Sequence, residues 1–163
     1  MDQAWMVDSL RGADQTKCLT ALAACQNNSA LDTSLVMAVL PLTAHPHESI
    51  REQAVEICEG MQSPPAELAI PLTTYLPTAR GDAAYWCVTL LGRLAGESVA
   101  AISVLATCLE RHELLAVRER AAWALGKIGP AAQKARPSLE KAAAATDPRL
   151  SRLAKDALEA IGE

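Results

Sequence analysis

The feature that most constrains the fold of this chain is a repeat within its sequence. The segment IREQAVEICEGM at residues 50–61 matches VRERAAWALGKI at residues 117–128 through a shared Arg-Glu pair and a following alanine. Between them, AAYWCVTLLGRL at residues 83–94 ends on Leu-Gly-Arg-Leu, which matches Leu-Gly-Lys-Ile. The period is about 33 residues, a length that repeat architectures use for one pair of helices.

Weaker copies extend the repeat to both ends of the chain. LSRLAKDALEAIG at residues 150–162 carries the apolar stripe again, and KCLTALAAC at residues 17–25 is a degenerate copy. The intervening segments also repeat, because Pro41, Pro71 and Pro137 each stand before an apolar run. Such a proline either starts a helix or bends one. We predict five units of two helices each, at residues 2–27, 30–62, 66–96, 98–129 and 131–162.

Each unit has an apolar stripe that two helices cannot bury alone, so neighbouring units must stack. In VRERAAWALGKIG the stripe runs through Val117, Ala121, Leu125 and Ile128 at helical spacing. Half of the residues are apolar but only 3% are aromatic and none is Phe, which favours a core of small aliphatic side chains between close-packed helices. The sequence therefore predicts an all-α fold, a single-domain α-solenoid of about five antiparallel helix pairs.

The segments VRERA and ALGKIG, together with the prolines, resemble HEAT repeats of the short variety that also occurs in phycobilin lyase subunits. The resemblance covers nearly the whole chain and is closest over residues 98–129. The period is shorter than the usual HEAT range of about 40–47 residues, but signature motifs of tetratricopeptide and ankyrin repeats do not occur in the sequence. The resemblance implies a scaffold whose second helices line the concave face.

HEAT repeats also often carry a ladder in which an Arg at the start of the second helix pairs with an Asp of the inner turn. Arg51 and Arg118 match the Arg, whereas only Asp147 clearly matches the Asp. The resemblance therefore implies an incomplete ladder.

Trp123 lies almost opposite the apolar stripe of its own helix, beside Arg120 and Lys127. If the second helices line one face, Trp86 of the neighbouring unit lies about one helical turn away from Trp123. Aromatic and Arg side chains are enriched at interaction hot spots. We therefore predict a binding patch formed by Tyr85, Trp86, Arg93, Arg120, Trp123 and Lys127. The alternative is that Trp123 fills the space between two repeats and belongs to the packing.

Charge argues against a nucleic-acid partner. The 15 basic and 19 acidic residues give a net charge of −4, whereas binding to a phosphate backbone depends on many Lys and Arg contacts. The C-terminal end is locally basic, through Lys134, Arg136, Lys141, Arg149, Arg152 and Lys155. We interpret this polar surface as the cap of a terminal repeat. A docking site for an acidic partner is the other interpretation.

Five cysteines, an odd number without a CxxC pair, predict free thiols in a reducing compartment. No signal-like segment opens the sequence, and no apolar run approaches the roughly 18 residues of a membrane span. We expect a cytoplasmic protein without membrane contact.

Candidates for catalysis or metal binding are weak. Cys108 and His112 stand one helical turn apart, the one pairing that could activate a thiol. His45 and His47 stand beside Glu48, but zinc requires three or four ligands, so they are interpreted as turn residues. Phosphate-binding loops and nucleophile elbows do not occur in the sequence. We predict no catalytic, cofactor or metal site.

The predicted function is a non-enzymatic scaffold that binds a protein partner on the face lined by the second helices. The alternative is a subunit of an enzyme that resembles phycobilin lyases and acts on a bilin or a protein. Recognition of nucleic acid by HEAT-like repeats is a third possibility, which conflicts with the acidic charge balance. The sequence supports no prediction of the oligomeric state.

Overall fold

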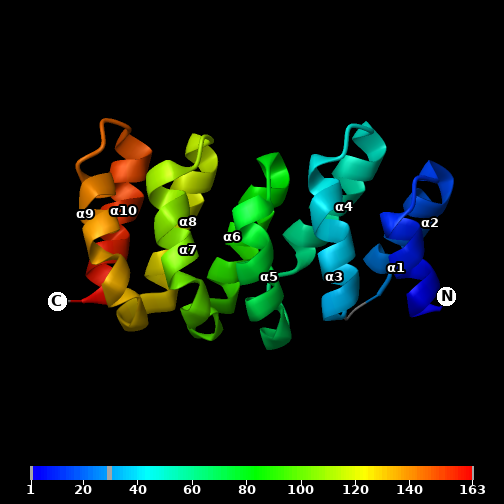
Figure 1. The fold of residues 1–163 in the computed structure, drawn as a ribbon, viewed down its shortest axis with the longest axis horizontal. Helices are drawn as coiled ribbons and strands as arrows, with labels where there is room; N and C mark the ends of the chain where they lie inside the picture. Colours follow the sequence, from blue (N-terminus) through cyan, green and yellow to red (C-terminus); the bar gives the residue numbers. More distant parts are fainter. Residues whose placement is uncertain (1, 29–30, 163) are drawn as a thin grey trace.

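The computed structural model describes residues 2–28 and 31–162, and it forms a row of helix pairs (Figure 1). Residue 30, where the second predicted unit begins, lies outside the described residues. The α-helices are α1 (Gln3–Arg11), α2 (Gln15–Gln26), α3 (Thr33–Val39), α4 (Glu48–Gly60), α5 (Ala69–Tyr75), α6 (Gly81–Leu94), α7 (Ile102–Arg111), α8 (Leu115–Ile128), α9 (Arg136–Ala143) and α10 (Pro148–Ile161). Short 3₁₀ helices join them: η1 (Leu40–Ala44), η2 (Ala66–Leu68), η3 (Leu76–Thr78), η4 (Ala95–Ala101) and η5 (Gly129–Ala135).

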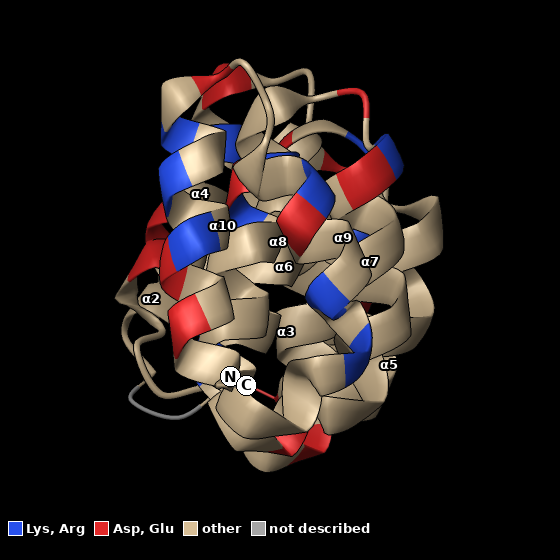
Figure 2. Ribbon diagram, turned by 90° about the vertical axis from the view of Figure 1, so that its left-hand side faces the viewer, with Lys and Arg blue, Asp and Glu red and all other residues tan. Residues whose placement is uncertain are grey.

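The helix pairs stand side by side from the N-terminus to the C-terminus (Figure 1). Seen from the C-terminal end, the first helices α5, α7 and α9 lie on one side, and the second helices α4 and α10 lie on the other (Figure 2). No strand occurs within residues 2–28 and 31–162. The predicted all-α solenoid of stacked helix pairs is confirmed.

Local signals in the sequence account for several helix ends. The carboxylate of Asp14 accepts hydrogen bonds from the backbone N–H groups of Thr16 and Lys17, and this starts α2. The carboxylates of Asp32 and Asp147 start α3 and α10 in the same way. An N-terminal cap of this kind contributes about 1 kcal/mol, because it satisfies N–H groups that have no partner within the helix.

The repeated prolines occupy two kinds of position. Pro71 and Pro137 stand in the first turn of α5 and α9, where the missing N–H group is not needed. Pro41 instead stands at the second position of η1, directly after α3. There it removes a donor and coincides with the change from an α-helix to a tighter 3₁₀ helix.

The core is made of the apolar stripes that the repeat predicts. Ala54, Ala121 and Ala154, which occupy matched positions of three repeats, are fully buried. Small side chains let neighbouring second helices approach closely. A Cβ atom added at Gly126 would lie 3.1 Å from the Cα atom of Ala157, so α8 and α10 pack almost backbone to backbone at this point.

The junctions of the stack are not equally tight. Helix α8 packs extensively against both α6 and α10, whereas α6 meets the preceding pair mainly through η1 and touches α4 only slightly. The contact between the α3–α4 pair and the α5–α6 pair therefore involves little of the two second helices. Hydrogen bonds from side chains across the junction between these two pairs consequently contribute a larger share of its stability.

One segment, Gly81–Arg111, is long and apolar enough to span a membrane by length and composition. It is not a single helix in the fold. Ala95 has a φ angle of 49° and Ser98 is non-helical, so the segment divides into α6, η4 and α7. Much of its apolar surface, above all in α6, is buried against neighbouring helices, as in the core helices of a folded domain.

Candidate functional site

The six residues predicted to form a binding patch lie on two neighbouring helices and form one connected group. Tyr85, Trp86 and Arg93 are on α6, and the other three are on α8. We call this group the aromatic cluster: Tyr85, Trp86, Arg93, Arg120, Trp123 and Lys127. Four cation–π contacts and one edge-to-face contact between aromatic rings link all six of its members.

Arg120 holds the two halves of the aromatic cluster together. Its guanidinium carbon lies 4.8 Å from the centroid of the Tyr85 ring and 4.9 Å from that of the Trp123 ring. It also donates a hydrogen bond to the Tyr85 hydroxyl. Cation–π contacts contribute about 0.5–2 kcal/mol each, so Arg120 connects α6 to α8 and fixes the orientation of both rings.

Trp86 differs from the sequence-based prediction, which placed it in a binding patch on the surface. Its side chain is only 9% exposed, and it meets Tyr85 edge to face with the ring centroids 5.5 Å apart. The physical reason is the central position of α6, which buries 10 of its 14 residues and so has no single apolar stripe. Trp86 is a packing residue that contacts the ring of Tyr85.

Trp123 is partly buried, and its ring covers Gly92 of the preceding repeat. A Cβ atom added at Gly92 would lie 2.2 Å from Cζ3 of Trp123, a separation that atoms do not tolerate. Lys127 lies over the same ring, with its Nζ atom 5.9 Å from the centroid. One side of Trp123 therefore fills the space between α6 and α8, and another side lines the surface between α8 and α10.

Arg93 has a structural role that the repeat pattern did not indicate. Its guanidinium donates hydrogen bonds to the carbonyl oxygens of Cys58 at 2.7 Å and Met61 at 2.8 Å, at the C-terminal end of α4. Burial and the nearby charge of Arg120 lower the pKa of Arg93. Arg93 thus joins α6 to α4 across the junction where these two helices otherwise touch little.

Replacing Arg93 with methionine is expected to lower the free energy of unfolding by about 1.5–3 kcal/mol, because two carbonyl oxygens lose a charged donor. Urea unfolding followed by circular dichroism measures this change. The control is Lys127→Met at the matched position of α8, where the side chain is exposed and the expected change is below about 0.5 kcal/mol. Equal effects of the two substitutions would contradict the bridging role of Arg93.

Two adjoining cavities lie between α8 and α10, with volumes of about 180 and 240 Å³. They share Trp123 and Leu153, so together they form one elongated depression. We call it the α8–α10 groove, lined by Tyr85, Ala116, Glu119, Arg120, Trp123, Gly126, Lys127, Arg149, Leu153, Asp156, Ala157 and Ala160. Four of the six residues of the aromatic cluster line this groove.

The charges of the α8–α10 groove are arranged around one ion pair. A guanidinium nitrogen of Arg149 on α10 lies 3.2 Å from a carboxylate oxygen of Glu119, which is largely buried on α8. Arg120 and Lys127 add two further basic groups, and Asp156 adds one acidic group. Basic residues also recur along α10 (Figure 2). The groove is therefore weakly basic although the chain as a whole is acidic.

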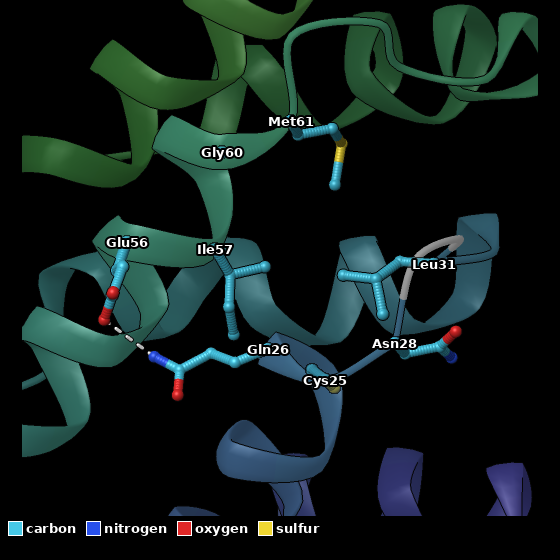
Figure 3. A pocket seen from close by; sticks show the side chains of 8 residues that line it. All are labelled: Cys25, Gln26, Asn28, Leu31, Glu56, Ile57, Gly60 and Met61. Atoms are coloured by element: carbon cyan, nitrogen blue, oxygen red, sulfur yellow. Dashed lines mark hydrogen bonds between the residues drawn. The ribbon is translucent and has the colours of Figure 1, made fainter.

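A further cavity of about 350 Å³ lies between α2 and α4, at the other end of the same layer. Leu31, which precedes α3, points into it, as do Ile57 and Met61 from α4 and its C-terminal end (Figure 3). At its edge the side-chain amide of Gln26 donates a 2.8 Å hydrogen bond to a carboxylate oxygen of Glu56. None of the residues predicted from the sequence to form a binding patch lines this cavity, although Glu56 and Trp123 occupy matched positions of their repeats.

The family resemblance implies an incomplete ladder, and neither Arg51 nor Arg118 forms an ion pair with an Asp among the residues that the structure describes. Arg51 donates to the carbonyl oxygen of His45, and Arg118 donates to that of Leu109, both at 3.0 Å and both within their own repeat. Asp147 accepts from the backbone of its own helix. The described side chains instead link the last two repeats through Glu119 and Arg149.

The thiols are shielded, and their chemistry is suppressed. All five cysteines are buried, and burial raises the pKa of Cys58 to about 12 and that of Cys108 to about 11. The Nδ1 atom of His112 accepts a hydrogen bond from the backbone N–H of Leu114 at 3.1 Å. His112 is thereby engaged with its own loop rather than with Cys108, and this pair does not resemble an activated thiol.

Ellman's reagent at pH 8 is expected to label the cysteines of the folded protein slowly and all five at once after unfolding in urea. Fast labelling of one thiol in the folded protein would contradict this prediction.

The raised thiol pKa values also predict how the free energy of unfolding depends on pH. Below the ordinary thiol pKa of 9.0, both states are protonated, and the stabilisation is fully present. It is lost as the pH rises toward 12, because only the unfolded chain ionises readily.

His45 and His47 belong to a turn before α4. The Nδ1 atom of His45 accepts a hydrogen bond from the backbone N–H of His47 at 3.0 Å. This geometry fits the interpretation of the pair as turn residues.

Comparison with known proteins gives matches in sequence and in fold. The family model for HEAT repeats matches residues 69–161, more than half of the chain, and covers the aromatic cluster and the α8–α10 groove. The fold is similar to that in a crystal structure of computationally designed armadillo repeat proteins for modular peptide recognition. The two chains are 20% identical with a TM-score of 0.64, and the alignment covers 95% of this chain and 80% of that chain. No curated protein matches the sequence.

The crystal structure of an engineered protein is similar in the same way. It is 20% identical with a TM-score of 0.62, and the alignment covers 96% of this chain and 77% of that chain. Identities this low establish the fold alone, and the alternative of a phycobilin-lyase-like enzyme gains no support from them. The sequence match over α5 to α10 and the stacked helix pairs lead to one conclusion: this chain belongs to the HEAT-repeat family.

Proposed function

We propose that the protein is a scaffold that binds an extended segment of a partner protein along the face lined by its second helices. The α8–α10 groove is its main binding site. The observation that carries this proposal is the position of Trp123, which is held by Gly92 and Arg120 and still lines the groove. The designed armadillo proteins of similar fold were made for peptide recognition, which supports a peptide-like ligand.

A preformed groove suits the binding of an extended segment. Arg120 fixes the Trp123 ring, and Leu153 and Ala157 provide an apolar wall on α10. Because these side chains are already ordered by their neighbours, little entropy is lost when a ligand covers them. Fixed aromatic side chains with adjacent cations are typical of residues that dominate binding energy.

The packing of the layers supports the second helices as the concave face. Helices α6, α8 and α10 approach one another closely at Gly92 and at Gly126, whereas α7 and α9 pack less extensively. In a curved stack the inner layer is the more crowded one. We infer that a ligand lies along this inner layer and that its other end reaches the cavity between α2 and α4.

The cytoplasm is our proposed location for this function. The support is the set of five free, buried cysteines, which suits a reducing compartment. We also propose a protein rather than a nucleic acid as the partner, because the net charge is −4.

Peptides selected from a random display library on the wild-type protein provide the test, with their affinities measured by fluorescence anisotropy. Trp123→Leu, which keeps an apolar side chain over Gly92, is expected to weaken binding about tenfold or more. Lys127→Glu reverses one charge of the groove and is expected to weaken the binding of acidic peptides. The matched control is Lys141→Glu on α9, which is exposed in the other layer and is expected to bind as wild type does. Wild-type affinity of both groove variants would refute the proposal.

A further inference from the structure

The layer of first helices carries a cavity that none of the roles above uses. It has a volume of about 440 Å³, larger than either half of the α8–α10 groove, and lies between the end of α5 and α7. We call it the α5–α7 cavity, lined by Leu76, Pro77, Ala79, Arg80, Ser103, Val104, Thr107, Cys108, Arg111 and His112.

The uneven packing of the first helices explains why this cavity exists. Helix α7 packs directly against α9, whereas α5 packs mainly against η4, which precedes α7. The C-terminal end of α5 continues into η3, where Pro77 lacks an N–H donor. Helices α5 and α7 therefore pack little against each other directly, which leaves part of their side chains uncovered.

The chemistry of the α5–α7 cavity is divided between an apolar floor and a cationic edge. Leu76, Cys108 and the partly buried Val104 supply carbon and sulfur atoms. The edge carries the guanidinium groups of Arg80 and Arg111, both exposed. No Asp or Glu is among the lining residues that the structure describes, although acidic residues outnumber basic ones in the chain.

Two of the polar groups are held in place by the backbone. The Nη1 atom of Arg80 donates to the carbonyl oxygens of Ala79 at 2.9 Å and Pro77 at 3.4 Å, which keeps its guanidinium at the cavity edge. Because Nδ1 of His112 accepts a backbone N–H, the proton of the neutral ring resides on Nε2. His112 therefore offers a donor to a ligand even when it is uncharged.

We propose that the α5–α7 cavity is a second peptide-binding site, which takes an apolar side chain of a partner with acidic residues beside it. The apolar floor accepts the side chain, and the two guanidinium groups and the His112 ring bind the carboxylates. The cavity is broad and open to solvent, so it covers one or two side chains but does not enclose an acyl chain. This site lies in the opposite layer from the α8–α10 groove and does not depend on it.

The probe is the peptide Ac-Asp-Glu-Leu-Glu-Asp-NH₂, titrated into protein with ¹³C-labelled Leu and Val methyl groups. We expect saturable NMR shifts of the Leu76 and Val104 methyl groups, with a Kd below about 1 mM. The neutral analogue Ac-Asn-Gln-Leu-Gln-Asn-NH₂ is expected to bind at least about fivefold more weakly, because it lacks the carboxylates. Octanoate, a short fatty acid, tests whether the cavity binds lipid instead of peptide. It is expected to leave the Leu76 and Val104 methyl signals unshifted.

Variants separate this site from the α8–α10 groove. The double substitution Arg80→Gln/Arg111→Gln is expected to raise the apparent Kd of the acidic peptide, measured from the shifts at Val104, about tenfold. Val104→Glu keeps both arginines of the cavity and is expected to abolish the peptide-induced shifts at Leu76. Trp123→Leu is expected to leave the shifts at Leu76 and at Val104 unchanged. Three results would overturn the proposal: unshifted Leu76 and Val104 methyl groups, equal binding of the neutral peptide, or stronger binding of octanoate. A failure of the α8–α10 groove to bind selected peptides would leave these readouts intact.

Discussion

Replacing Trp86 with alanine is expected to lower the free energy of unfolding by about 3–5 kcal/mol, the range for removing a large aromatic side chain from a packed core. Trp86 is only 9% exposed and packs edge to face on Tyr85. Its loss would leave a cavity beside α6, the second helix of the third repeat, which packs against α8 of the fourth repeat. Equilibrium unfolding in urea, followed by far-ultraviolet circular dichroism, measures the change.

The comparison variant for Trp86 is Trp123→Ala on the neighbouring helix. Trp123 is only partly buried, and its removal is expected to cost about 1–2 kcal/mol, because less apolar surface returns to water. The difference between the two variants carries the test. Similar costs for both, or a loss below about 1 kcal/mol for Trp86→Ala, would show that Trp86 is not a core residue.

A double-mutant cycle between Gly92 and Trp123 is expected to show strong coupling. The substitution Gly92→Ala places a methyl group where it would meet the Trp123 ring at 2.2 Å, and such overpacking costs about 1–3 kcal/mol. In the Trp123→Ala background the ring is gone. There Gly92→Ala is expected to stabilise the protein by up to about 1 kcal/mol, because alanine favours the helix more than glycine does.

The sign reversal is the decisive feature of this cycle. Residues in contact show coupling energies of about 0.5–3 kcal/mol, whereas independent sites add within about 0.5 kcal/mol. Additive effects of the two substitutions would contradict the seating of Trp123 on Gly92. The cycle also bears on function, because a ring displaced from Gly92 no longer lines the α8–α10 groove in the same orientation.

The sequence predicts the architecture well because the repeat is written in local patterns. A period of about 33 residues and prolines before apolar runs identify the helix pairs without knowledge of their packing. The aromatic cluster was also predictable in part. Matched positions of neighbouring repeats lie in rows, so Trp86 and Trp123 had to lie on adjacent helices about one turn apart.

Burial within the aromatic cluster could not be predicted, because it depends on neighbours that a single helix does not reveal. The helical pattern of α8 identifies one buried stripe, but α6 lies between helices on several sides and buries Trp86 as well. The bonds from Arg93 to α4 join residues 35 and 32 positions apart in the sequence. The α5–α7 cavity arises because α5 packs on η4 rather than directly on α7, and the sequence carries no pattern for it.

The most direct test of the central proposal is to locate a selected peptide on the protein by NMR. Cross-saturation from the bound peptide is expected at the indole N–H of Trp123 and at the methyl groups of Leu153 and Ala157, which line the α8–α10 groove. The methyl groups of Leu139 in α9 are fully buried and serve as an internal control. Saturation at Trp123 and Leu153 would support the second-helix face as the binding surface. Saturation confined to the first helices or the loops would contradict it.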